Sequence, residues 1–364
     1  MKQKTKFNLF IVLLIITMIS ILIYYFFVKE KFNTPQDPKD IEVPNLPRPF
    51  VNLLDDKGNK VNVILVSHPF TRETGDNGSY EQYNEWKDKG IHFVGITSYS
   101  EFPSVYSNPH DALSDPEDHS WKNHDYMKYF RLWLTCFRDS DKYIKDTTTK
   151  KALISESDFI NTEKFVPNPN MSKKYDFIYI CLEDDKETCK EGWNYYIRNW
   201  EFAKKALKVM CLKHHLKGAI IGRKNCTLPK GCSQYIELFD KLPQDELVKL
   251  YQQSKFLFLP NTADASPRVL PEALCCNLGC LVNYNILGGW KYVNIEKTGE
   301  FFKDENDFEP ALLRLLQNLP NYAPREYYTT NWGKHTTGVE LKKFLLNNLS
   351  NLNFTDESTK WITL

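Results

Sequence analysis

Residues 240–302 read DKLPQDELVKLYQQSKFLFLPNTADASPRVLPEALCCNLGCLVNYNILGGWKYVNIEKTGEFF, and they carry the clearest alternation of helix and strand signals in the chain. Pro243 and the acidic residues after it predict a helix, because proline and carboxylates suit the first turn. The apolar runs at 255–260 and 279–283 predict two buried strands. A Ser-Pro pair between these strands predicts the start of another helix. This alternation indicates an α/β fold with a parallel sheet.

The same alternation continues toward the N-terminus. Aromatic and apolar residues recur at helical spacing over residues 125–138, which predicts a helix there. An Asn- and Pro-rich linker at 166–173 separates two units of strands and helices. The further predicted strands are residues 61–66, 91–96 and 151–154 before the linker, and 175–181 and 216–221 after it.

Residues 9–28 form an apolar run without a charge, LFIVLLIITMISILIYYFFV. At about 1.5 Å rise per residue, a helix of this length spans the hydrocarbon core of a bilayer, roughly 30 Å. More net positive charge precedes the run than follows it, which places the short N-terminus in the cytoplasm. The bulky end of the run disfavours a cleaved signal peptide. We therefore expect a single-pass type II membrane protein whose globular part is lumenal (endoplasmic reticulum or Golgi-like) or otherwise non-cytoplasmic.

Residues 240–302 resemble the C-terminal domain of the family 4 retaining glycosyltransferases. The resemblance lies in the order of a proline-led acidic helix, a strand, an acid–loop–helix–acid element, and later glycines at 288, 289 and 299. It implies the GT-B fold, in which two Rossmann-like domains face a cleft at the carboxyl ends of their strands. It also implies a hexosyltransferase that uses a nucleotide-sugar donor and retains the anomeric configuration.

The chain of 364 residues is long enough for two domains and flanking segments. A proline-rich, charged stretch before the first predicted strand reads as a stem. The expected division is a cytoplasmic tail (1–8), a transmembrane anchor (9–28), a stem (29–59), an N-terminal acceptor domain (60–168), a C-terminal nucleotide-sugar-binding domain (169–322), and a helix that crosses back, followed by a tail (323–364).

The family carries an E-x7-E element, and Asp264 and Glu272 stand in that relation here. The resemblance implies that Asp264 contacts the donor sugar and that Glu272 binds the ribose. Aspartate at the first position shortens the reach of that carboxylate, which bears on the identity of the sugar. The expected catalytic residues are Asp264, Arg223 and Arg268, and the expected donor-binding residues are Glu272, Ser266, Val269, Lys224, Gly288, Gly289 and Lys291.

Several of these residues suit a diphosphate on physical grounds. The free N–H groups of the helix that is predicted to start near Ser266 attract phosphate. Arg268 adds a guanidinium that can bind phosphate through two hydrogen bonds. Arg223 follows a predicted strand, where a cation can stabilise the leaving diphosphate. Gly288 and Gly289 allow the backbone to approach a ligand closely.

Two alternatives stay open. An inverting GT-B transferase, similar to fucosyltransferases, would need a general base in the first domain, with His68, Glu156 or Asp158 as candidates. His68 and Glu156 are also the residues that we expect on the acceptor side. The second alternative is a catalytically inactive, membrane-tethered carbohydrate-binding protein. A buried Arg223 that faces away from the cleft would favour it.

The sequence predicts no essential metal and no cofactor besides the nucleotide-sugar substrate. Residues 139–141 spell D-x-D, the metal motif of the GT-A fold, which there follows a buried strand. Because the preceding residues predict a helix, we interpret this motif as a helix end. A Cys226–Cys232 disulfide would suit a lumenal compartment. The expected partners are a donor, a glycan, glycoprotein or lipid acceptor, and a membrane; near-equal charges, 47 basic and 46 acidic, argue against nucleic acid.

Overall fold

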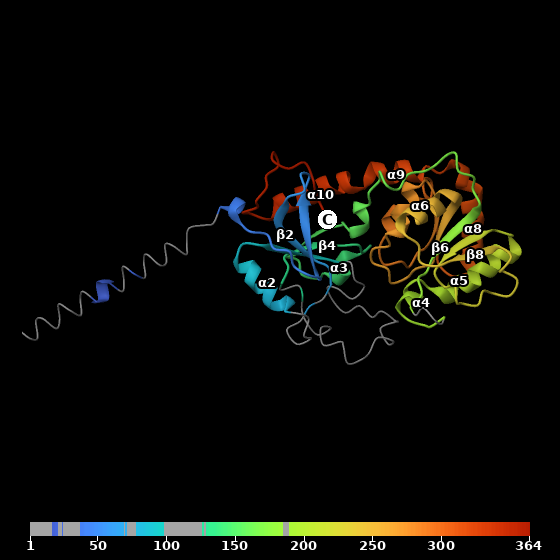
Figure 1. The fold of residues 1–364 in the computed structure, drawn as a ribbon, viewed down its shortest axis with the longest axis horizontal. Helices are drawn as coiled ribbons and strands as arrows, with labels where there is room; N and C mark the ends of the chain where they lie inside the picture. Colours follow the sequence, from blue (N-terminus) through green and yellow to red (C-terminus); the bar gives the residue numbers. More distant parts are fainter. Residues whose placement is uncertain are drawn as a thin grey trace, which may run out of the picture.

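The computed structural model describes residues 17–20, 24, 37–68, 70, 78–97, 126, 129–184 and 189–364. Two six-stranded sheets form the centres of two domains (Figure 1). Most of the predicted transmembrane run, residues 9–28, and all of the predicted tail before it lie outside the described residues. Within the described residues, no helix has both the length and the apolarity needed to cross a membrane.

The C-terminal sheet is parallel throughout and has the strand order β11-β10-β9-β6-β7-β8 of a Rossmann sheet. Helices cover both of its faces: Phe177 packs with α5 and α8, and Ile178 packs with α6 and α7. The strands are β6 (Tyr175–Ile180), β7 (Gly218–Ile221), β8 (Ile236–Phe239), β9 (Ser254–Leu259), β10 (Gly279–Asn283) and β11 (Gly299–Phe302). The helices are α4 (Trp193–Ile197), α5 (Trp200–Leu207) with a π-helical extension (Lys208–Lys213), α6 (Gln244–Gln253), α7 (Val269–Cys275) and α8 (Glu305–Asn318).

The N-terminal sheet is wound differently, with the order β12-β1-β2-β3-β4-β5. Strands β2 to β5 are parallel and lie in chain order, and the described helices between them lie on one face. Tyr83 of α2 and Ile144 after α3 pack on that face, against Ile64 and Val66. The elements are β1 (Phe50–Asp55), β2 (Lys60–Val66), α2 (Ser79–Asp88), β3 (His92–Ile96), β4 (Leu132–Leu134), α3 (Ser140–Tyr143) and β5 (Lys150–Ala152).

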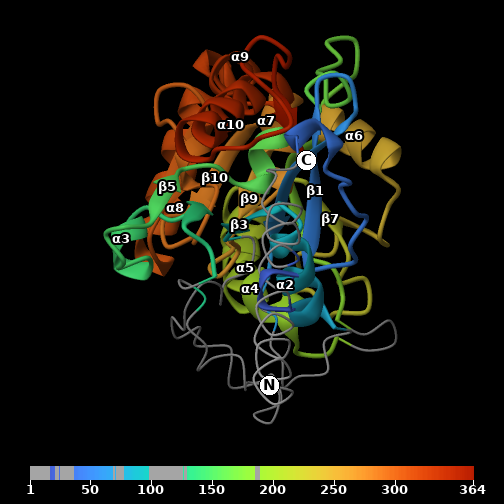
Figure 2. The ribbon, with the colours of Figure 1, turned by 90° about the vertical axis from the view of Figure 1, so that its left-hand side faces the viewer.

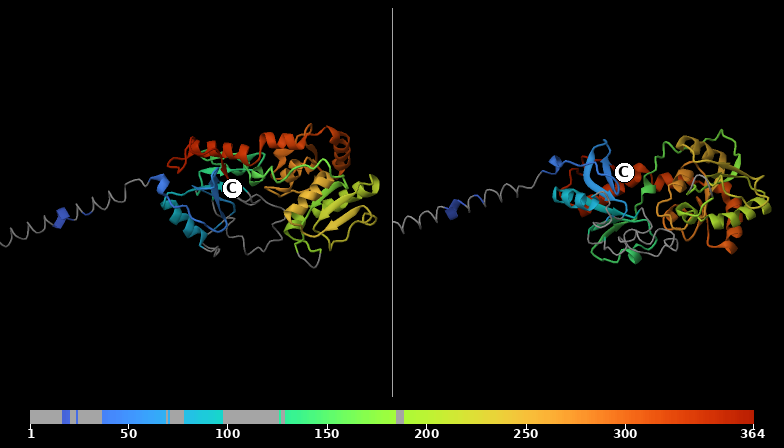
Figure 3. Two further views of the ribbon diagram at one scale, coloured as in Figure 1. Left: turned by 45° about the horizontal axis from the view of Figure 1, so that its top comes forward. Right: turned by 60° about the horizontal axis from the view of Figure 1, so that its bottom comes forward.

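The end of the chain covers the opposite face of this sheet. Leu341 and Leu345 of α10 (Lys334–Asn348) pack with Val63 and Leu65 of β2. Strand β12 (Ile362–Thr363) then pairs antiparallel with β1. Figure 2 shows α9 (Pro324–Asn331) and α10 on the side of the molecule opposite α2, and Figure 3 shows the C-terminus beside the N-terminal sheet.

Part of the predicted stem (29–59) belongs to the folded N-terminal domain. Strand β1 (Phe50–Asp55) pairs with β2, and Ile41 and Val43 before it pack against the aromatic face of the N-terminal core. The folded domain therefore includes residues that the density of prolines and charges had suggested would stay extended.

The predicted helix over 125–138 is wrong where the structure describes it, because Leu132–Leu134 form strand β4. The two leucines face α10, and Trp133 between them faces α2, as alternation in a strand requires. Tyr126 and Phe130 share a core with Trp133. The aromatic spacing thus reflects a common core and not a helical face.

Candidate functional site

The candidate site lies at the carboxyl ends of β6 and β9, where the strand order reverses and where ligands bind in open α/β sheets. Asp264, in the loop after β9, is only 9% exposed. Arg198, directly after α4, forms an ion pair with this carboxylate. Asn261 Nδ2 also donates a 2.8 Å hydrogen bond to Asp264 Oδ2. An acid predicted to contact a sugar is therefore held rigidly at the reversal point.

Two buried oxygens beside this ion pair lack partners. Asn261 is fully buried and its Oδ1 accepts no hydrogen bond from the described residues, and the same holds for Thr262 Oγ1. Buried polar atoms are nearly always paired in folded proteins, because an unpaired one costs on the order of 1–3 kcal/mol. This corner can therefore accept and donate hydrogen bonds to a polar ligand. The sequence did not single out Asn261, Thr262 or Arg198.

Glu272, the second acid of the pair, lies in the first turn of α7 and is 6% exposed. Tyr251 donates a 3.1 Å hydrogen bond from its hydroxyl to Glu272 Oε2. Burial raises the pKa of Glu272 to about 7, although this bond and the charge of Arg268 oppose the rise. A carboxyl group poised near neutrality can accept hydrogen bonds from a diol once it is ionised.

The start of α7 differs from the prediction. The helix begins at Val269 with the exposed Arg268 at the N-cap position, and it has no side-chain cap. Ser266 does not cap it: its hydroxyl lies 2.6 Å from the Ser157 hydroxyl and accepts from the Ser157 backbone N–H. The Arg268 guanidinium remains at the surface, and Asp264 pairs with Arg198 instead of Arg268.

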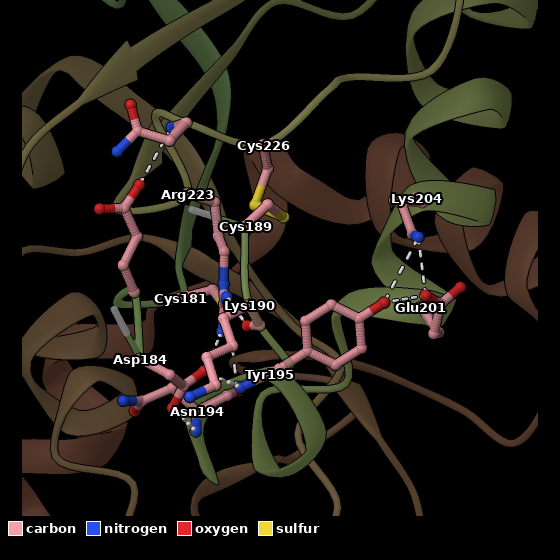
Figure 4. Close-up of a disulfide and its surroundings, with 12 residues drawn as sticks. Cys181, Asp184, Cys189, Lys190, Asn194, Tyr195, Glu201, Lys204, Arg223 and Cys226 are labelled. Carbon is pink, nitrogen blue, oxygen red and sulfur yellow. Dashed lines mark hydrogen bonds and ion pairs between the residues drawn. A yellow bond between two sulfur atoms is a disulfide. The ribbon is translucent and has the colours of Figure 1, made fainter. Parts of the chain in front are cut away.

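Arg223 is not placed to bind a diphosphate (Figure 4). Its side chain is fully buried and pairs with Asp184 Oδ2 at 2.7 Å. Further hydrogen bonds run to Cys181 Sγ and to the carbonyl oxygen of Lys190. Asp184 in turn accepts from backbone N–H groups at the start of α4. Arg223 therefore joins the loops after β6 and β7 and has a structural role.

Cys226 forms a disulfide with Cys189 and not with Cys232, a pairing that the sequence offered but did not assign (Figure 4). Strands β6 and β7 are parallel neighbours, so the loops that follow them lie side by side and bring these two cysteines together. Cys232 remains a free, buried thiol. The exposed Lys224 in the same region pairs with Asp240. Arg223 and Lys224, the two basic residues after β7, are therefore both engaged by carboxylates away from the β6–β9 reversal.

Lys291 builds the contact between the domains, whereas Gly288 and Gly289 pack against the loop before α7. Lys291 forms a buried ion pair with Asp158 at 2.6 Å, and Tyr292 donates to the same carboxylate. A Cβ on Gly288 would lie 1.8 Å from the carbonyl oxygen of Ala265, and one on Gly289 would lie 2.5 Å from Pro267. These glycines permit close approach of two protein segments, and Lys291 has no free donor role at a ligand.

His68 and Glu156 lie on the N-terminal side of the cleft, at the carboxyl ends of β2 and β5. The Ser67 hydroxyl lies 3.1 Å from His68 Nδ1, and burial together with the charge of Arg48 lowers the pKa of His68. Glu156 is half-buried at the start of a 3₁₀ turn (Glu156–Phe159). Their predicted acceptor role stays a prediction.

The D-x-D motif lies differently from our interpretation. Residues 139–141 follow strand β4 by a short loop and lead into α3, so they do not end a helix. Asp141 forms an ion pair with Lys151. Among the described residues, no group of three or more His, Cys, Asp or Glu side chains could hold a metal ion.

No protein-family model and no curated protein sequence matches the chain. Solved structures do match, at low identity. Sucrose-phosphate synthase from Thermosynechococcus elongatus aligns over 72% of this chain and 70% of its own, with a TM-score of 0.51 and 12% identity. TarM aligns over 75% of this chain and 53% of its own, with a TM-score of 0.56 and 12% identity.

WaaG, described as a glycosyltransferase involved in lipopolysaccharide biosynthesis, aligns over 78% of this chain and 85% of its own, with a TM-score of 0.52 and 14% identity. At such identities the likeness concerns the fold. The chain has the fold of the GT-B glycosyltransferases, with two Rossmann-like sheets.

Proposed function

We propose that this chain is a glycosyltransferase that moves a sugar from a nucleotide-sugar donor to a glycan, protein or lipid acceptor, with retention of configuration. The observation that carries the proposal is the corner at the β6–β9 reversal, where Arg198 fixes Asp264 beside the unpaired oxygens of Asn261 and Thr262. Sugar hydroxyls donate and accept hydrogen bonds, so they match this set. Proteins of similar fold, GtfA and HepE, were solved with UDP and with GlcNAc or glucose.

Each residue has a separate task in this proposal. Asp264 orients the donor sugar, and ionised Glu272 accepts hydrogen bonds from the ribose hydroxyls. The exposed guanidinium of Arg268 stabilises the charge that develops on the leaving diphosphate, a role that electrostatic catalysis assigns to fixed cations. The proposal includes no essential metal, so we expect chelators to leave the activity unchanged.

The membrane anchor and the compartment belong to the same proposal. Residues 9–28 tether the catalytic part, which faces the lumen or another non-cytoplasmic space. The Cys189–Cys226 disulfide supports this placement, because such bonds persist in oxidising compartments. Accessibility of the catalytic part to protease in sealed vesicles tests the orientation.

A binding panel of UDP-, GDP- and ADP-sugars tests the proposed function on the full chain. We expect one donor to bind and turn over, and Glu272→Gln to weaken its binding at least 10-fold, about 1.4 kcal/mol. Glu326→Gln, at an exposed position of α9, is the matched control and keeps wild-type affinity. If the folded chain binds no nucleotide sugar, the proposal fails. If a donor is turned over, proton NMR of the product anomer distinguishes retention from inversion.

A second candidate is a membrane-tethered carbohydrate-binding protein without catalysis. The buried Arg223 favours it, because a cation expected at the leaving diphosphate is engaged inside the domain. An inverting transferase loses one of its candidate bases, since Asp158 is fully buried and paired with Lys291. Binding of a donor or glycan without any turnover would select the binding protein.

A further inference from the structure

A pocket of about 280 Å³ lies between the two domains, at the carboxyl ends of β4 and β10. It is lined by Phe137, Arg138, Asp139, Lys142, Tyr284, Asn285, Ile286 and Leu287. Leu287 N–H donates to the Thr262 carbonyl at 2.8 Å, and Gly288 N–H donates to the Asp264 carbonyl at 2.9 Å. A group bound in this pocket would therefore lie beside the loop that carries the proposed sugar-contacting acid.

Arg138 is the most unusual side chain in the pocket. Its guanidinium carbon lies 4.3 Å from the ring centroid of Tyr284, 4.9 Å from that of Trp290 and 5.1 Å from that of Phe301. Nη2 also donates a 3.1 Å hydrogen bond to the Tyr284 carbonyl. These contacts hold the flat guanidinium in one orientation, which lowers the entropy lost on binding a ligand.

No carboxylate neutralises Arg138 within the described part of the chain, although the side chain is partly desolvated. Its pKa is lowered by that burial, which is consistent with a charge that lacks an ionic partner. Lys142 adds a second cation to the lining, and Lys303 Nζ lies 5.6 Å from the Tyr284 ring. Asp139 is the acidic residue of the lining, so cations dominate.

We propose that this pocket binds an anionic group, a phosphate or a carboxylate, on the acceptor. The inference rests on the proposed function, because it assigns the acceptor to a site beside the donor corner. An arginine fork with free N–H donors recognises planar or tetrahedral oxyanions by paired hydrogen bonds. The volume lies just below the usual range of ligand pockets, roughly 300–1,000 Å³, which suits one charged sugar or headgroup and not a long chain.

Calorimetric titration of the full chain tests this with three probes: glucose 6-phosphate, glucuronate and neutral glucose. We expect at least one anionic probe to bind 10-fold or more tightly than glucose, and the two anionic arms distinguish phosphate from carboxylate. Arg138→Gln abolishes this preference and Lys142→Gln reduces it several-fold. Arg131→Gln, an exposed arginine just before β4 and outside the pocket, keeps it.

Binding of UDP-sugars, measured on the same proteins, separates the two proposals. Arg138→Gln keeps donor affinity if the pocket serves the acceptor. If the chain binds anions through Arg138 but binds no nucleotide sugar, the anion site is supported and the transferase proposal fails. Equal binding of glucose and the anionic probes, no binding of any probe by the folded wild type, or unchanged anion binding in both Arg138→Gln and Lys142→Gln would overturn the anionic-acceptor proposal.

Discussion

The two sheets bury their apolar faces in different ways. The C-terminal sheet reverses its strand order, so its own crossovers cover both faces. In the N-terminal sheet β2 to β5 follow one another in one direction, and the described helices between them lie on one face. Helix α10 covers the other face, and β12 extends the sheet at the edge of β1. The first domain is thus completed by the last residues, whereas the second domain is self-contained.

The largest difference between the two domains is expected when the face that α10 covers is disrupted. Leu341→Ala and Leu345→Ala each remove a fully buried side chain from it, and each costs about 2–5 kcal/mol of unfolding free energy. We expect the double variant to raise hydrogen exchange in β2 and β3 while β6 and β9 stay protected. Leu313→Ala, at a position of α8 that is 47% exposed, is the control. Equal loss of protection in both sheets would show that the domains unfold as one unit.

The second largest effect is expected for a substitution in the contact between the domains. Asp158→Asn leaves the Lys291 ammonium buried without its counter-charge, which costs about 3–5 kcal/mol. We expect two resolved thermal transitions for this variant and a single one for the wild type, because this pair ties the domains together. The control is Asp240→Asn, whose partner Lys224 is exposed, with an expected change below about 1 kcal/mol. A single, unshifted transition in the Asp158 variant would contradict the role of this pair.

The smallest effect is confined to the C-terminal domain and depends on pH. Burial raises the pKa of Glu272 to about 7, against about 4.3 in an unfolded chain. The folded state therefore holds the proton more tightly, and wild-type stability falls as the pH rises from about 4 to 7. We expect Glu272→Gln to gain on the order of 1–3 kcal/mol over the wild type between pH 4 and pH 8.

Denaturant titrations of both proteins at pH 4 and pH 8 measure this difference. Glu326→Gln, at an exposed position, should show no pH-dependent gain. A gain of the same size in both variants, or none in Glu272→Gln, would mean that Glu272 is ionised in the folded protein well below neutrality.

Local signals were sufficient for four of the six strands of the C-terminal sheet, whereas the short strands β8 (Ile236–Phe239) and β11 (Gly299–Phe302) were not predicted. Strand, turn and helix follow one another within residues 240–302, and the resemblance to a family with an E-x7-E element pointed to Asp264 and Glu272. The N-terminal sheet gave weaker signals, because strand β4 (Leu132–Leu134) is too short to show alternation and its aromatic neighbours mimic a helix.

The site residues that sequence reasoning missed or misassigned depend on contacts between distant segments. Arg198 pairs with an acid on another loop, and the partner of Cys226 follows from which loops are neighbours at the sheet edge. Arginine is a residue type that binds phosphate, and only the burial of Arg223 against Asp184 shows that its guanidinium is engaged inside the domain. A sequence states which groups are present but not which of them already satisfy one another.

The pairing of β12 with β1 has a consequence for synthesis. Residues Ile362–Thr363 leave the ribosome after the whole C-terminal sheet, yet they complete the sheet that begins at Phe50. The N-terminal sheet therefore keeps one apolar face uncovered while the C-terminal domain is synthesised, and the C-terminal domain can fold first. The usual order, in which domains fold from the N-terminus during translation, is reversed here. A nascent chain stalled shortly before α10 would be the form most in need of a chaperone.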